Sequence, residues 1–131
     1  MTSTKNIFIS GRVIRGQRYG RVLGFRTANL ERRQWARLRR KPKLGVWAGW
    51  VAEVGYKAKI QNWPAAVVVG PLDSRGLPKL EAHLIGFQGN LYGKRLVICL
   101  CRYLRPFRRY SSEAALRRQI QADIRRARAQ V

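Results

Sequence analysis

Short apolar segments of strand length recur along the chain, with turn signals between them. They cover residues 7–14, 46–54, 65–69, 80–85 and 96–104. A shorter segment at residues 25–30 brings the expected strands to six, and most of them follow one another without an intervening helical pattern. The spacing therefore predicts an all-β fold, a six-stranded antiparallel Greek-key barrel, rather than alternating strands and helices.

Two helical segments are expected beside the strands. Residues 31–40 favour a short basic helix, and breaks are expected at 41–43, 62–64 and 71–78. Near the end of the chain, Ser111 or Ser112 can cap a second helix. Apolar residues then recur every three or four positions, at Leu116, Ile120, Ile124 and Ala127. We expect an amphipathic α-helix of about four turns whose apolar stripe covers the barrel.

The chain carries a large excess of positive charge. It has 28 Lys and Arg residues against 6 Asp and Glu, a formal net charge of +22 at pH 7. Its 131 residues suit a single domain, residues 1–131, with a core of its own. A balance this basic implies anionic partners, which could be nucleic acid, phosphorylated small molecules or an acidic membrane.

The sequence also bears on location and redox state. No segment approaches the roughly 20 apolar residues of a membrane span, and residues 1–10 lack a secretory signal pattern. We therefore expect a cytoplasmic monomer without a membrane partner.

Cys99 and Cys101 would share one face of a strand, where they are poorly placed to bridge to each other. Buried, reduced thiols are the expectation, rather than metal or redox chemistry.

A glycine-rich segment before residue 30 is the first candidate for chemistry. Gly16, Gly20 and Gly24 permit tight turns and let a ligand approach backbone N–H groups, which bind phosphate oxygens. Thr27 and Asn29 would share a face of an extended segment and offer neutral oxygen ligands to a hard cation such as Mg²⁺. A hairpin in which these two residues only cap a turn would have the same spacing. The G-x-x-x-x-G-K-[ST] pattern of a P-loop is absent.

Glu81 is the second candidate, because acidic residues are scarce and this one lies mid-strand on the same face as His83. Surrounding positive charge favours an ionised carboxylate, which could accept a proton from a substrate hydroxyl. The alternative is a structural carboxylate paired with one of the many arginines. His83 is expected to be a hydrogen-bonded structural residue.

The third candidate is the run R-Y-L-R-P-F-R-R-Y at residues 102–110, in which aromatic and basic side chains alternate. Such a run can stack on a flat heterocycle or on nucleic-acid bases. Pro106 is expected to end the strand, which places the residues up to Tyr110 in a loop before the final helix. A solvated basic loop with Tyr110 packed under the helix is the alternative.

Together these segments resemble the riboflavin kinase domain, which forms the C-terminal half of bacterial bifunctional FAD synthesis enzymes. The family's G-[FI]-P-T-A-N motif reads G-F-R-T-A-N at residues 24–29, and its G-[VI]-[YW]-x-G-W element reads G-V-W-A-G-W at 45–50. The E-x-H-[IL], [LF]-Y-G and Y-L-R-P elements follow in the family's order at 81–84, 91–93 and 103–106. The family's closing helix pattern fits residues 111–123, so the resemblance covers nearly the whole chain.

The resemblance implies a riboflavin kinase, which transfers the γ-phosphate of ATP to the 5′-hydroxyl of riboflavin and forms FMN and ADP. In the family, the residues matching Thr27 and Asn29 organise Mg²⁺ and the phosphates. The residue matching Glu81 is the catalytic base, and the one matching Arg105 lies on the flavin side, where Tyr110 is a second candidate. The expected ATP-binding residues are Gly16, Gly20, Arg21, Gly24, Phe25, Thr27, Asn29 and Tyr92.

The chain departs from the family pattern in several places. Arg26 replaces a proline, so the ATP loop is looser or Arg26 adds a phosphate contact. Residues 71–76 replace an N-P-[TY] element, and Phe107 replaces a common acidic residue. The adenylyltransferase half is missing, so FAD synthesis is not expected. Met1 fits a chain that was not cut from a longer enzyme.

Two rival functions stay open at this stage. One is a catalytically inactive kinase-like barrel that binds flavin or RNA, and the other is a basic nucleic-acid barrel unrelated to flavins. The presence of Thr27, Asn29 and Glu81 together favours an active kinase, because a non-catalytic barrel has no physical need for that trio.

Overall fold

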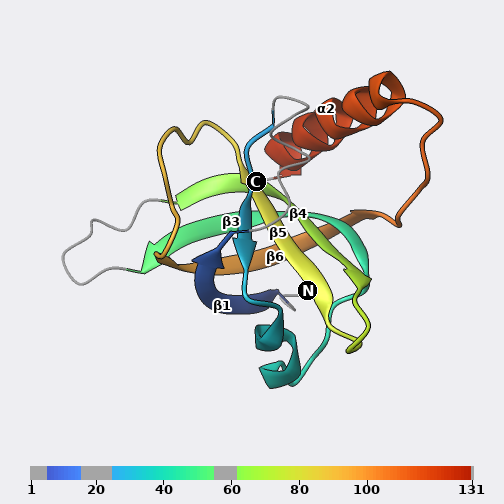
Figure 1. The fold of residues 1–131 in the computed structure, drawn as a ribbon. Coiled ribbons are helices and arrows are strands. Elements are labelled where there is room, and N and C mark those ends of the chain that lie inside the picture. Colours follow the sequence, from blue (N-terminus) through green and yellow to red (C-terminus); the bar gives the residue numbers. More distant parts are fainter. Residues whose placement is uncertain (1–5, 16–24, 55–61, 131) are drawn as a thin grey trace.

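The computed structural model describes residues 6–15, 25–54 and 62–130. Within these ranges six antiparallel strands close into a barrel in the order β1-β2-β5-β4-β3-β6 (Figure 1). The strands are β1 (Ile7–Ile14), β2 (Ala28–Leu30), β3 (Gly45–Val54), β4 (Asn62–Leu72), β5 (Pro78–Leu84) and β6 (Arg95–Arg105). Strands β3, β4 and β5 form a meander and β6 returns beside β3, which is the Greek-key arrangement. The predicted barrel is confirmed.

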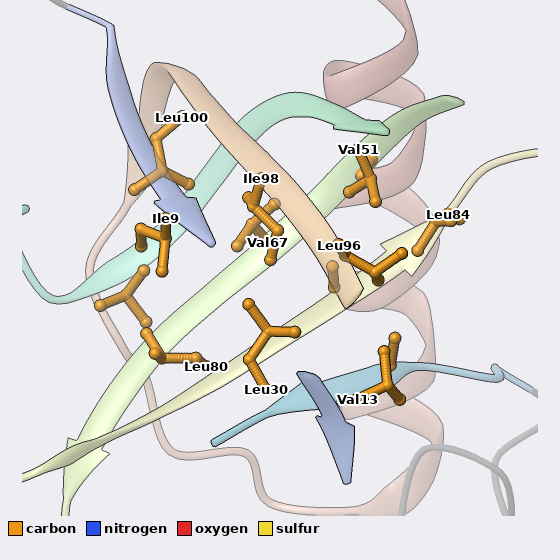
Figure 2. Packing of buried hydrophobic residues seen from close by; sticks show 14 of the residues in the cluster. Ile9, Val13, Leu30, Val51, Val67, Leu80, Leu84, Leu96, Ile98 and Leu100 are labelled. Atoms are coloured by element: carbon orange, nitrogen blue, oxygen red, sulfur yellow. The ribbon is translucent and has the colours of Figure 1, made fainter. Parts of the chain in front are cut away.

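Aliphatic side chains fill the barrel interior. On β5, Leu80, Ala82 and Leu84 all belong to the core cluster. The labelled side chains in Figure 2 come from all six strands and meet inside the barrel. Because successive residues of a strand point to opposite faces, the residues next to these core positions, Asn29 and Glu81 among them, face outward.

Two glycines of the G-V-W-A-G-W element let β3 and β6 approach each other closely. A Cβ atom on Gly49 would overlap the carbonyl oxygen of Cys99, and one on Gly45, whose φ is +143°, would overlap that of Arg105. A side chain at either position would force the two strands apart. This part of the family pattern therefore serves the barrel itself.

The C-terminal helix α2 (Glu113–Gln130) lies outside the barrel against β3, β4 and β6 (Figure 1). The backbone N–H of Ala115 donates to Ser112 Oγ over 3.1 Å, so Ser112 is the cap. Ile124 and Ala127 pack on an apolar cluster on the outer face of the barrel. The predicted amphipathic helix is confirmed, although its 18 residues make five turns rather than four. Among the described residues, no helix combines the length and the apolar character needed to cross a membrane.

Strand boundaries differ from the expectation in two places. β4 begins at Asn62, within the expected break, and includes Pro64. The carbonyl of Pro64 accepts from the N–H of Ile85, just past the end of β5, so the missing N–H of Pro64 costs the sheet no ladder hydrogen bond. β2 is shorter than residues 25–30 and contains only Ala28–Leu30. The expected helix at 31–40 is the 3₁₀ helix η1 (Arg32–Arg37).

The two cysteines on β6 are free, with Sγ atoms 3.6 Å apart. Each is half-buried rather than buried, so the expected burial of the two thiols is wrong. Burial, together with the neighbouring Cys101 thiol, raises the pKa of Cys99 to about 12. Cys99 is therefore a protonated, weakly nucleophilic thiol near neutral pH.

Candidate active site

Paired residues on neighbouring strands form one row across the outer face of the barrel. Asn29 of β2 pairs with Glu81 of β5, and Glu81 pairs with Val68 of β4. Val68 pairs with Val46 of β3, which pairs with Arg105 of β6. Side chains at directly paired positions lie on the same face of a sheet. The barrel therefore brings the expected base, Glu81, next to the expected metal ligand, Asn29.

Two side chains hold the Glu81 carboxylate, one on each oxygen. The Thr27 hydroxyl donates a hydrogen bond to Oε1, and the Lys79 ammonium lies 2.8 Å from Oε2. The Glu81 side chain is only 10% exposed and that of Lys79 is 21% exposed. A carboxylate this buried needs partners, and here one is a neutral donor and the other a cation.

Sequence reasoning missed Lys79. The available signal was its position two residues before Glu81 on the same strand, which places both side chains on one face. Sequence reasoning instead expected an arginine as the structural alternative, because arginines are so numerous.

A pocket of about 610 Å³ opens beside Thr27 and Asn29. Phe87, Leu91 and Tyr92 give it an apolar and aromatic wall. Its other lining residues include polar, cationic and aliphatic side chains: Val13, Ile14, Arg15, Arg26, Thr27, Ala28, Asn29, Ala82, His83, Leu84, Gly89 and Asn90. The Arg15 guanidinium lies 5.3 Å from the centre of the Tyr92 ring. Rings, cations and neutral oxygens in one pocket suit a ligand that joins a flat heterocycle to anionic groups.

His83 anchors the segment that leads into β2. Its Nδ1 lies 2.7 Å from the carbonyl oxygen of Arg26, and since a carbonyl can only accept, Nδ1 carries the proton. The Phe25 ring meets the imidazole edge-on, with the ring centres 6.0 Å apart. The expected structural role of His83 is thus visible. Its hydrogen bond restrains the backbone at Arg26, where the family pattern has a proline.

A second, smaller pocket of about 330 Å³ lies on the Lys79 side of Glu81. It is lined by Ile14, Arg15, Asn29, Leu30, Arg32, Lys79 and Leu80, a set with three cations and no acid. Asn29 and Arg15 line both pockets. The Glu81 carboxylate therefore has one oxygen bonded to a residue of the larger pocket and the other to a residue of the smaller pocket.

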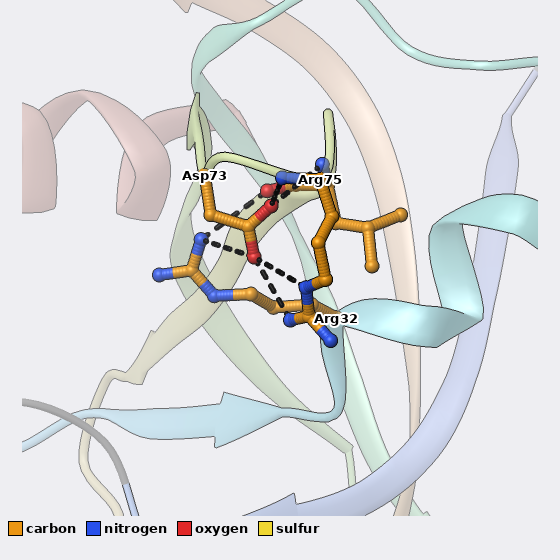
Figure 3. A network of polar contacts seen from close by, with 4 residues as sticks. Arg32, Asp73 and Arg75 are labelled. Atoms are coloured by element: carbon orange, nitrogen blue, oxygen red, sulfur yellow. Dashed lines mark hydrogen bonds and ion pairs between the residues drawn. The ribbon is translucent and has the colours of Figure 1, made fainter.

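The turn between β4 and β5, which replaces the family's N-P-[TY] element, positions Arg32 at the smaller pocket. Asp73 accepts from the backbone N–H groups of Arg75 and Leu77 over 2.8 and 3.1 Å. The guanidinium groups of Arg75 and Arg32 lie 2.9 and 3.6 Å from Asp73 Oδ2 (Figure 3). Hydrogen bonding from the Arg75 side chain lowers the pKa of Asp73 to about 2. Arg32 also donates to the carbonyl of Leu77, which ties η1 to the turn.

Arg105 and Tyr110, the expected flavin-side residues, lie together at the far end of the row. Arg105 makes a two-pronged ion pair with Asp123 of α2, with distances of 2.8 and 2.7 Å, and this pairing raises the pKa of Arg105. The guanidinium lies 6.0 Å from the centre of the Tyr110 ring. Arg105 is three strands from Glu81, about 14 Å at ~4.8 Å per strand.

The Tyr110 hydroxyl is buried and has no hydrogen-bond partner among the described residues. A buried polar atom left without a partner in a protein usually meets water or a ligand. This atom therefore marks a place where a polar ligand group would be stabilised.

Comparison with known proteins adds to this geometry. The family model for flavokinase, described as riboflavin kinase, matches residues 3–131. The chain belongs to the riboflavin kinase family. It is 37% identical over 124 residues to the bifunctional riboflavin kinase/FMN adenylyltransferase of Pseudomonas fluorescens, a match that covers 92% of this chain and 37% of the relative. The chain thus spans well under half the length of the curated relatives it matches.

Solved structures share the fold. The crystal structure of riboflavin kinase from Trypanosoma brucei superimposes with a TM-score of 0.73 at 23% identity, over 98% of this chain and 82% of that one. The crystal structure of a macrolide-efflux protein from Streptococcus pneumoniae has a TM-score of 0.75 at 25% identity, over 92% of this chain and 38% of that one. The barrel with its C-terminal helix is therefore the fold of solved riboflavin kinases.

Several expected family residues lie outside the described ranges. These are Gly16, Gly20, Arg21 and Gly24 of the glycine-rich segment. The described part of the site contains Phe25, Thr27, Asn29, Glu81 and Tyr92. Thr27, Asn29 and Tyr92 line the larger pocket, and Glu81 accepts the Thr27 hydrogen bond and pairs with Asn29 across the sheet.

The donor set bears on the expected Mg²⁺ site. No group of three or more His, Cys, Asp or Glu side chains that could hold a metal ion occurs among the described residues. Thr27 and Asn29 supply neutral oxygens at the larger pocket, and Glu81 is hydrogen-bonded to Thr27. This set fits Mg²⁺ that arrives on a ligand's phosphates, since the ion then keeps phosphate and water oxygens in most positions.

Proposed function

We propose that this chain is an ATP:riboflavin 5′-phosphotransferase, which converts riboflavin and ATP to FMN and ADP. One observation carries the proposal: the two oxygens of a buried carboxylate are held by residues of two different cation-lined pockets, one by a hydroxyl and the other by an ammonium. Phosphoryl transfer needs little else from a protein than positioned ligands, balanced charge and a group that orients the attacking hydroxyl. Membership of the riboflavin kinase family supports the choice of substrate. A cytoplasmic monomer stays our expectation.

ATP would occupy the larger pocket. Its adenine would lie along Phe87 and Tyr92, and its phosphates would lie near Arg15 and Arg26. Thr27 and Asn29 would hold Mg²⁺ together with phosphate oxygens, and when bound the ion would supply neutralisation of phosphate charge. The glycines at 16, 20 and 24 lie outside the described residues, and phosphate binding by this segment stays a prediction.

Riboflavin would bind outside the barrel. Its ring would approach Tyr110, whose unpartnered hydroxyl suits a polar ring edge, and its ribityl chain would bring the 5′-hydroxyl to the Glu81 carboxylate. Arg105 would act on the flavin side, although its bond to Asp123 makes helix docking its first role.

Glu81 would act as the base. Oε1 accepts the hydroxyl proton while the 5′-oxygen bonds to the γ-phosphorus, and the bond from that phosphorus to the β–γ bridging oxygen breaks to release ADP. Thr27 keeps Oε1 oriented until substrate arrives, and Lys79 holds Oε2 until the proton is transferred. The burial of Glu81 keeps bulk water from competing for the phosphoryl group.

Incubation with riboflavin, ATP and Mg²⁺, followed by chromatographic separation of FMN from riboflavin, tests the proposal. We expect FMN to form, and to form in proportion to ADP. Absence of FMN with several nucleotide triphosphates and divalent metals, while flavin still binds, would instead support the inactive flavin-binding barrel.

A second candidate function is nucleic-acid binding, and helix α2 favours it. Four exposed arginines lie within about 100° of the helix circumference, and these are Arg117, Arg118, Arg125 and Arg128. Arginine forks match phosphate oxygens better than lysine does. The apolar stripe of α2 is occupied by the barrel, which argues against insertion into a membrane surface.

Matched charge variants test this second function with a duplex RNA of about 20 base pairs. Replacing the four α2 arginines by glutamine should weaken binding. It should also make the slope of log K against log salt concentration shallower, by the equivalent of about four phosphate contacts. The control replaces four exposed arginines elsewhere, Arg12, Arg37, Arg39 and Arg95. Equal losses in the two variants would show diffuse attraction by net charge and would exclude α2 as a binding surface.

A further inference from the structure

The smaller pocket collects positive charge at a place that the phosphoryl-transfer scheme does not yet use. Arg15, Arg32 and Lys79 line it, and no acidic residue does. Two of these cations have other fixed contacts. Arg32 is bound to the β4–β5 turn through Asp73 and the carbonyl of Leu77, and Arg15 lies over the Tyr92 ring.

Lys79 differs from the other two because its partner is the reacting carboxylate. Its Nζ lies 2.8 Å from Glu81 Oε2, and its side chain is 21% exposed. The ammonium therefore contacts the expected base and borders the smaller pocket at the same time.

We propose that the smaller pocket binds the phosphate monoester of the flavin product and that Lys79 is its principal contact. This inference rests on the proposed function. When Glu81 accepts the hydroxyl proton, its carboxylate becomes neutral and the ion pair with Lys79 loses its attraction. In the same step a phosphate monoester carrying about −1.5 to −2 charges forms on the 5′-oxygen next to Glu81. Lys79 then pairs with the phosphate, and Glu81 returns its proton to solvent after release.

This exchange of partners makes the site selective for flavin phosphate over riboflavin. With an ionised Glu81, Lys79 is shared between the carboxylate and any phosphate nearby. With a neutral residue at position 81, the full charge of Lys79 is available to the phosphate. The affinity for FMN, and not that for riboflavin, should thus depend on both residues.

Equilibrium binding of FMN and of riboflavin, each followed by quenching of flavin fluorescence, tests this without turnover. In Lys79→Met the affinity for FMN should fall about tenfold or more while that for riboflavin changes less than about twofold. Lys79→Arg should retain most of the FMN affinity. In Glu81→Gln the affinity for FMN should rise above that of the unmodified protein, and Lys79→Met in that background should remove the gain.

A matched control is Lys94→Met, which removes a lysine from its ion pair with Glu53 over 3.3 Å and changes a residue that lines neither pocket. It should alter neither flavin affinity. Equal loss of riboflavin and FMN affinity in Lys79→Met, or no gain in Glu81→Gln, would overturn the inference. Because binding is measured without ATP, a protein that forms no FMN but shows these affinities would contradict the proposed function and leave the inference standing.

Discussion

Two buried carboxylates outside the barrel interior are held in different ways. Asp123 is 5% exposed, receives both prongs of Arg105, and accepts a further bond from Gln119 over 3.0 Å. Glu81 is 10% exposed and has one small neutral donor and one lysine. Burial alone does not separate the two.

The difference lies in what their partners can do. The partners of Asp123 belong to the contact between α2 and β6, and releasing them would remove the polar part of that contact. The partners of Glu81 each line a pocket and can turn to a ligand. A carboxylate whose partners face ligand space is suited to chemistry, and one whose partners are used up in packing is structural.

The largest effect is expected from a substitution that tests Glu81 as the catalytic base. Glu81→Gln should lower FMN formation by about 10³-fold, because the amide cannot accept the hydroxyl proton. Riboflavin binding should stay near that of the unmodified protein, since the shape of the side chain is kept. A steady-state assay with chromatographic detection measures the loss. Activity within about tenfold of the original would remove Glu81 from the role of base.

Asp123→Asn tests the other carboxylate, which is assigned a structural role. It leaves the Arg105 guanidinium, 13% exposed, without its carboxylate, and should lower the free energy of unfolding by about 3 kcal/mol. Urea denaturation followed by tryptophan fluorescence gives the value. The chemical step should be little affected in protein that is still folded. A stable variant with greatly reduced activity would contradict the structural assignment.

Thr27→Ala tests the neutral partner of Glu81. It removes a hydrogen bond to a charged group, worth about 1.5–3 kcal/mol, and should lower kcat/KM about 10- to 100-fold. Thr27→Ser, which keeps the hydroxyl, should recover most of the activity. If serine is as impaired as alanine, the methyl group and not the hydrogen bond is what matters.

The smallest effect concerns a third, more exposed carboxylate, Asp73. Its pKa is about 2 in the folded chain against 3.8 ordinarily, so its stabilising effect is present above about pH 3.8 and is lost as the pH falls through about 2. Asp73→Asn should lower the unfolding midpoint slightly at pH 7, and the difference from the unmodified protein should shrink as the pH falls across that window. Calorimetry at several pH values checks this. A constant difference would show that the bonds of the turn do not depend on the charge of Asp73.

The sequence predicted the barrel more completely than the site. Alternation along residues 7–14 and 80–85, with turn signals between segments, was enough to predict six strands. The predicted break at Pro64 was wrong, because a proline is tolerated in a strand at a position where the neighbouring strand has already ended. That depends on the register between two strands, which no local pattern contains.

Within the site, the sequence predicted which residues carry chemistry but not their partners. Thr27 and Asn29 were placed on one face from their spacing, and Glu81 was singled out as a scarce acid. Neither the bond from Thr27 to Glu81, across 54 positions, nor the partner of Arg105 could be inferred from spacing. The roles themselves still await the assays above.

By itself the sequence determined the all-β class, the capped C-terminal helix and the family, because these follow from local periodicity and from short ordered motifs. Only the tertiary structure decided that Lys79 joins the expected base to a second pocket and that Arg105 is bound to α2. The physical reason is that barrel closure and helix docking set the distances between charges far apart in the chain. Those distances decide which carboxylate is held in packing and which can meet a ligand.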